Sequence, residues 1–109
     1  MLEIIRKKFL RNIQIYDIDM EELLRKQENG AIIIDVRSTQ EYNEGHIKGA
    51  INIPYYEISK NIRYVIPNLL TEIVVYCGIG ARSKRAYKIL KKLQYHNVYN
   101  LYGGIENWQ

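Results

Sequence analysis

Five short apolar segments along the chain predict the strands of a sheet. Residues 31–36 are apolar except for Asp35, and residues 73–76 are apolar throughout, as expected of strands that are buried on both faces. The other three predicted strands are shorter and span residues 12–16, 50–53 and 98–101. In the first of them Ile13 and Ile15 alternate with polar residues and would share one face.

Helical patterns separate these predicted strands. Asp19 followed by Glu22, and Ser38 followed by Glu41, are both typical of a helix start, where an N-cap side chain is answered by a carboxylate one turn later. The two helices are expected to end at residues 29–30 and 45. Apolar residues at helical spacing predict two more helices, over residues 58–66 and from about Ser83 to residue 93, and residues 105–108 fit a last helical turn.

This alternation of strands and helices predicts one α/β domain. The chain of 109 residues is of single-domain size, so we expect residues 1–109 to form one unit around a central, largely parallel β-sheet with helices on both faces. No apolar run approaches the roughly 20 residues that cross a bilayer. The start of the chain lacks the apolar core of a signal peptide, so no membrane association is expected.

Positive charge is concentrated in the last third of the chain. The formal net charge is +4, and no acidic residue occurs between Glu72 and Glu106. Six basic residues fall in that interval: Arg82, Lys84, Arg85, Lys88, Lys91 and Lys92. Such a region attracts small anions and is a candidate docking surface for a protein partner, although a solvated helix face has the same composition. A nucleic-acid partner is not expected, because no known recognition motif is present.

The single cysteine, Cys77, follows the predicted strand 73–76 and precedes a glycine-containing loop. One cysteine excludes an intrachain disulfide and a cysteine-cluster metal site, so neither a metal nor a cofactor is expected. A free thiol suits the reducing cytoplasm, the expected compartment. Cys77 at a strand end could be a small buried apolar residue, but the glycines, Arg82 and the helix start that follow it favour a nucleophile.

The residues after Cys77 are suited to holding an anionic sulfur. The backbone amides of Gly78, Ile79, Gly80, Ala81 and Arg82 can converge on the sulfur and on an anionic substrate, because glycine permits a tightly curled loop. The Arg82 guanidinium is a candidate partner for a substrate oxyanion, and Ser83 suits the N-cap of the next helix. Cys77 follows the predicted strand 73–76, and Asp35 lies near the end of the predicted strand 31–36. Ligands of open α/β sheets bind beyond such carboxyl ends of strands.

Five segments in order resemble the rhodanese family of sulfurtransferases. They are Ile34-Asp35-Val36-Arg37, Glu41-Tyr42, residues 45–54 (GHIKGAINIP), residues 75–83 (VYCGIGARS) and residues 101–108 (LYGGIENW). The resemblance implies a rhodanese-like fold and a Cys77 persulfide that carries sulfane sulfur from thiosulfate or a persulfide donor to a thiol or to cyanide, without a cofactor. It also implies that Asp35 and Arg37 are structural supports beside the site.

Two other functions share these residues. The chain could act as a persulfide carrier that receives sulfur from one protein and passes it to another, with the basic helix as docking surface. It could also be a small-oxyanion phosphatase or arsenate reductase. Cysteine-dependent phosphatases place five residues between cysteine and arginine, whereas four separate Cys77 from Arg82, which favours sulfur transfer. Ile79 adds an apolar side chain and no cation to the loop, which leaves room for a thiol-bearing donor.

Overall fold

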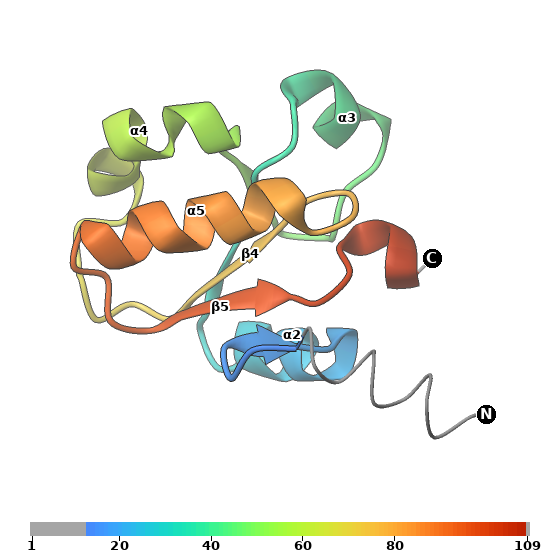
Figure 1. The fold of residues 1–109 in the computed structure, drawn as a ribbon, viewed down its shortest axis with the longest axis horizontal. Coiled ribbons are helices and arrows are strands. Elements are labelled where there is room, and N and C mark those ends of the chain that lie inside the picture. Colours follow the sequence, from blue (N-terminus) through green and yellow to red (C-terminus); the bar gives the residue numbers. More distant parts are fainter. Residues whose placement is uncertain (1–12, 109) are drawn as a thin grey trace.

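The computed structural model describes residues 13–108, and these contain one five-stranded sheet in which all neighbouring strands are parallel (Figure 1). The strand order is β1-β5-β4-β2-β3. The strands are β1 (Asp17–Ile18), β2 (Ile32–Asp35), β3 (Ile51–Asn52), β4 (Ile73–Tyr76) and β5 (Val98–Leu101).

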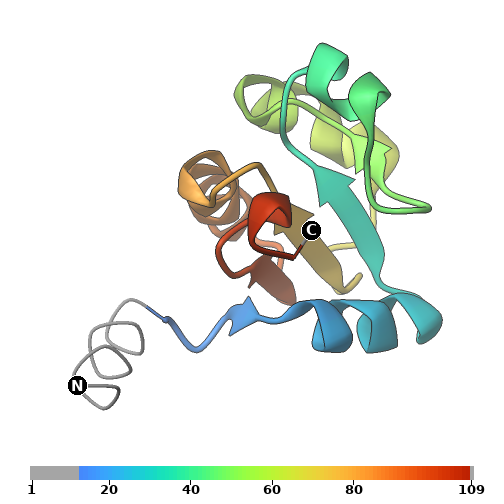
Figure 2. The same ribbon diagram turned by 90° about the vertical axis from the view of Figure 1, so that its right-hand side faces the viewer.

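Helices cover both faces of this sheet, which confirms the predicted α/β class (Figure 2). The α-helices are α2 (Met20–Glu28), α3 (Thr39–Glu44), α4 (Ile58–Val65) and α5 (Ala81–Lys92), and two 3-10 turns are η1 (Tyr55–Glu57) and η2 (Ile105–Trp108). Helix α2 packs on one face through the fully buried Leu23, while α4 and α5 pack on the other through residues such as Ile62 and Leu90. No helix within residues 13–108 combines the length and the apolar character that crossing a bilayer requires.

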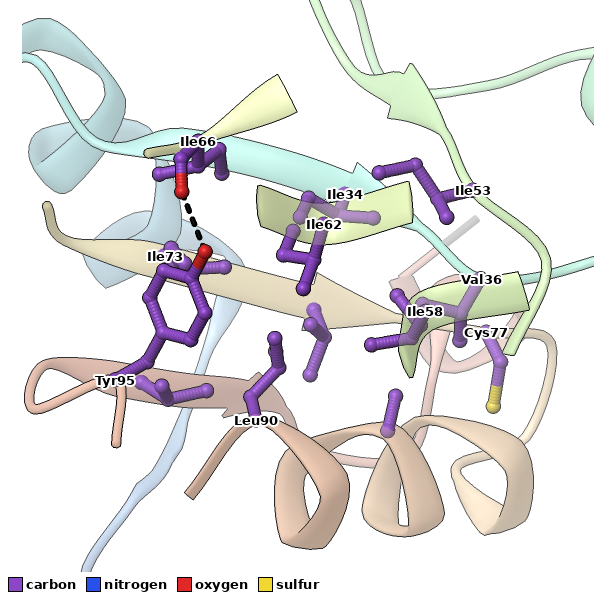
Figure 3. Packing of buried hydrophobic residues seen from close by; sticks show 13 residues of the cluster. Ile34, Val36, Ile53, Ile58, Ile62, Ile66, Ile73, Cys77, Leu90 and Tyr95 are labelled. Carbon is purple, nitrogen blue, oxygen red and sulfur yellow. Dashed lines mark hydrogen bonds between the residues drawn. The ribbon is translucent and has the colours of Figure 1, made fainter. Parts of the chain in front are cut away.

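The two central strands supply the core on both faces because their side chains alternate. Ile34 and Val75 lie in the cluster beneath α4 and α5, and Ile33 and Val74 lie in the cluster beneath α2. Every residue of β4 is buried, as the uninterrupted apolar run predicts. Figure 3 shows the α4–α5 cluster, with Cys77 at its end nearest the start of α5.

The predicted first strand, residues 12–16, is wrong in position. Residue 12 lies outside the described residues, and residues 13–16 lead into a turn instead of a strand, with Ile15 fully exposed. The Asp17 amide donates to the Gln14 carbonyl at 2.9 Å, and the Asp17 carboxylate accepts from the Gln14 amide at 2.8 Å, so the chain reverses here. The strand begins only at Asp17, where pairing with β5 becomes available.

The connections place a crevice between β2 and β4. From β2 the chain continues to β3 on one side, and from β4 it continues to β5 on the other. In open α/β sheets, ligands bind outside the carboxyl ends of strands at such a change of direction. In Figure 1, α3, the start of α5 and η2 gather at this end of the sheet.

Candidate active site

Cys77 lies at the carboxyl end of β4 with its sulfur turned into the loop that follows. The side chain is 1% exposed. Its Sγ accepts from the Gly80 amide at 3.1 Å and from the Ser83 amide at 3.3 Å, and the Ser83 hydroxyl oxygen lies 3.4 Å away. Backbone amides that converge on one atom form an anion-binding concavity.

Helix α5 begins two residues before the predicted start, and Ser83 is not its N-cap. Gly80 caps the helix with φ +114°, a left-handed conformation that lets the loop turn directly into the helix. Ser83 is instead the third residue of α5, where its hydroxyl donates to the Gly80 carbonyl at 3.1 Å. The earlier start brings the positive end of the helix dipole to Cys77.

The five loop residues predicted to bind substrate line two adjacent hollows. Gly78, Ile79 and Arg82 line a pocket of about 470 Å³, hereafter the loop pocket. Ile79, Gly80 and Ala81 line a second pocket of about 430 Å³. Ile79 belongs to both and is 72% exposed, so it forms an apolar ridge between them.

The Arg82 guanidinium is bound by a carboxylate of α3. Its Nη1 and Nη2 donate to the two carboxylate oxygens of Glu41 at 2.7 and 2.9 Å. This pair, together with the bonds from Ser38 to the carboxylate, lowers the pKa of Glu41 to about 2. Ser38 and Glu41 form the predicted capping box of α3, so the same carboxylate caps one helix and holds the first turn of another.

Asp35 and Arg37 form a buried ion pair beside the loop. The Arg37 Nη2 lies 2.6 Å from Asp35 Oδ2 and also donates to the Gly45 carbonyl at 2.7 Å. The Tyr76 hydroxyl donates to Asp35 Oδ2 at 2.8 Å and accepts from the Ile47 amide at 3.0 Å. Burial raises the pKa of Tyr76, so its phenol stays neutral and a donor. The network joins the ends of β2 and β4 to the segment before β3.

The sequence did not reveal how the turn before η2 contacts the loop. The Ile105 amide donates to the Cys77 carbonyl at 2.8 Å, and the Glu106 amide donates to the Gly78 carbonyl at 3.1 Å. Gly104 has φ +73°, and a Cβ built there would lie 2.2 Å from the Gly78 carbonyl oxygen. The pair Gly103-Gly104 predicts a turn, but no neighbouring residue in the sequence indicates which segment of the chain that turn contacts.

The described residues hold no evident metal site. Within residues 13–108 no group of three or more His, Cys, Asp and Glu side chains is placed to bind a metal ion.

Comparison with known proteins identifies the family. Residues 19–109 match the family model of the rhodanese-like domain. The chain belongs to the rhodanese-like family. It is 30% identical to the thiosulfate:glutathione sulfurtransferase of Saccharomyces cerevisiae, over 94% of this chain and 83% of that protein.

Two further relatives agree. The thiosulfate sulfurtransferase PspE of Escherichia coli is 38% identical, over 68% of this chain and 70% of that protein. The structure of the human single-domain sulfurtransferase TSTD1 matches with a TM-score of 0.76 and 27% identity, covering 87% of this chain and 96% of that one. These similarities confirm the predicted enzyme class, a rhodanese-type sulfurtransferase.

Proposed function

We propose that Cys77 carries the transferred sulfur as a persulfide between two half-reactions. One observation supports this most directly: the backbone amides of Gly80 and Ser83 both donate to the sulfur of Cys77, the only cysteine in the chain. Hydrogen bonds to an ionised group are stronger than those to a neutral one, so the loop stabilises a thiolate and, after loading, a persulfide anion.

The proposed first half-reaction loads the enzyme. The Cys77 thiolate attacks the sulfane sulfur of thiosulfate or of a persulfide donor, a new S–S bond forms, and sulfite or the donor thiolate leaves with the bonding electron pair. In the second, a thiol or cyanide attacks the outer sulfur, that S–S bond breaks, and the Cys77 thiolate is restored. The sequence of steps needs no cofactor.

The surrounding residues have separate proposed roles. Gly78, Ile79, Gly80, Ala81 and Arg82 form the walls of the substrate pockets, and Ser83 donates to the sulfur through its amide. The buried pair of Asp35 and Arg37 supports the strand ends on which the loop stands.

Intact-mass measurement tests the central step. After mixing with thiosulfate or with glutathione persulfide and removal of excess donor, the wild type should gain one sulfur atom per chain. The Cys77→Ala variant should gain none and should have no turnover. Thr71→Ala, a change in the loop before β4, is the matched control and should load like the wild type. Turnover by the Cys77→Ala variant would refute the proposed role.

Helix α5 supports a further proposal, that a protein donor or acceptor docks on its basic outer face. Arg85, Lys88, Lys91 and Lys92 are exposed on this helix, which begins at the sulfur loop. Reversing the charge of Lys88 and Lys92 should slow transfer from a protein persulfide and leave turnover of thiosulfate unchanged. Equal slowing of both reactions would contradict docking.

The proposed compartment is the cytoplasm, because a reducing environment keeps the thiol free.

A further inference from the structure

The loop pocket has an unexpected charge balance. Its lining includes two arginines and three glutamates: Arg37, Arg82, Glu41, Glu44 and Glu106. The basic run of the sequence predicts a positive field beside Cys77. However, Arg82 is the only member of that run that lines this pocket.

Both arginines already have carboxylate partners. Arg37 is bound to Asp35 and to the Gly45 carbonyl, and this ion pair is almost completely buried. Arg82 is bound through two nitrogens to Glu41. Each guanidinium therefore has a carboxylate at hydrogen-bond distance, which weakens its attraction for a substrate anion.

Glu44 and Glu106 remain without a cationic partner among the described residues. The Glu44 carboxylate accepts one bond from the Gln40 side chain at 3.3 Å. The Glu106 carboxylate lies against the sulfur loop, since its Oε2 would be 3.2 Å from a Cβ built on Gly78. The backbone of Glu106 is held there by the hydrogen bond that its amide donates to the Gly78 carbonyl. The mouth of the pocket therefore carries net negative charge.

We propose that this acidic mouth, with Glu106 as its main determinant and Glu41 as the residue that neutralises Arg82, selects the class of sulfur carrier. It favours thiols and persulfides that bear positive charge beside the sulfur, and it disfavours anionic carriers, the thiosulfate dianion most strongly. The physical reason is Coulombic: within residues 13–108 the carboxylates that line the pocket outnumber its arginines, and this excess raises the free energy of an approaching anion and lowers that of a cation. The inference rests on the proposed persulfide of Cys77.

The acceptor half-reaction isolates this effect. The enzyme is loaded with inorganic polysulfide, freed of excess and mixed with a thiol, and intact mass follows the loss of the outer sulfur. The thiol attacks that sulfur, the S–S bond of the Cys77 persulfide breaks, and the acceptor leaves as a persulfide. Three small thiols differ mainly in charge: cysteamine is cationic, 2-mercaptoethanol is neutral and 3-mercaptopropionate is anionic.

The readout is the ratio of the variant rate constant to the wild-type rate constant for each thiol, because the intrinsic reactivity of the thiol cancels. For Glu106→Gln this ratio should rise from cysteamine through 2-mercaptoethanol to 3-mercaptopropionate, by about threefold per step at low salt. Glu41→Gln should give the same order, since glutamine can keep the capping box of α3 while Arg82 loses its counter-charge. Glu28→Gln is the matched control, because this exposed residue ends α2 shortly before the amino end of β2, whereas the pocket lies beyond the carboxyl ends of the strands.

The outcomes separate the two proposals. If the wild type takes up no sulfur from polysulfide or any other donor, the proposed function fails and the inference falls with it. If loading is normal but Glu106→Gln and Glu41→Gln give equal ratios for all three thiols, only the inference is refuted. A graded ratio in Glu28→Gln would also overturn it, because the effect would then reflect net charge and not the pocket. A graded ratio in the two pocket variants alone, weakened by added salt, supports it.

Discussion

Replacing Gly104 by alanine tests whether the turn before η2 supports the sulfur loop. An alanine at φ +73° costs about 1–2 kcal/mol because of its left-handed backbone. The new Cβ would also lie 2.2 Å from the Gly78 carbonyl oxygen, so either the loop or η2 must move. Overpacking of this kind adds about 1–3 kcal/mol. The expected loss of unfolding free energy is therefore about 2–5 kcal/mol.

Gly30→Ala provides a control that also has a positive φ but no clash. Gly30 has φ +98°, and a Cβ built there meets nothing within 4 Å. This variant should lose only the strain, about 1–2 kcal/mol. The difference between the two variants in urea unfolding, followed by circular dichroism, isolates the contact between Gly104 and the loop.

Two signals show where the clash is relieved. Trp108, the only tryptophan, is in η2 and donates to the Tyr102 carbonyl at 3.0 Å, so its fluorescence reports movement of η2. The rate of sulfur loading at a temperature where each variant is folded reports distortion of the loop. If Gly104→Ala matched Gly30→Ala in stability, fluorescence and loading rate, the close approach of the two segments would be refuted.

Two further substitutions test the network and the ion pair. Tyr76→Phe removes the hydroxyl that donates to Asp35, so it should lower the unfolding free energy by about 1–3 kcal/mol, and an unchanged urea midpoint would contradict the buried network. The folded-state pKa of Glu41, about 2, is below its ordinary value, so the Arg82 pair stabilises the fold above about pH 4.5 and that contribution disappears as pH falls toward 2. Because both side chains are about one-third exposed, we expect at most about 1 kcal/mol between wild type and Glu41→Gln at pH 6. This difference should fall to roughly half or less of that value at pH 3 and approach zero only near pH 2, so a difference that grew on acidification would refute the assignment.

The parts of the fold that the sequence predicts correctly depend on local patterns. The continuous apolar runs of β2 and β4 favour burial on both faces, and their length of four to six residues suits a strand better than a helix. The capping box of Ser38 and Glu41 forms as predicted because all its atoms lie within one helical turn. The resemblance to the rhodanese family rests on the same kind of contiguous segments.

Local patterns also mislead where several residues compete for one role. Glu22 is expected to return to the backbone at Asp19, but it binds Arg25 instead, while the Asp19 side chain still accepts from the Glu22 amide. Ser83 is a good N-cap by type, yet Gly80 takes that place because the loop must turn sharply. In each case the residue has the right chemistry, and the geometry of its neighbours decides which contact is made.

The charge of the site is the property that a linear reading predicts least well. Arg82 lies five positions after Cys77, so proximity in the sequence suggests that its guanidinium serves the sulfur or its substrate. Its partner Glu41 lies on another helix, 41 positions earlier, and Glu106 reaches the loop only because the chain returns through β5. Neutralisation depends on distances of a few ångströms between segments that the sequence separates widely. A run of basic residues therefore predicts the charge of the outer face of α5, whereas the charge at the mouth of the pocket follows only from the folded arrangement of the carboxylates.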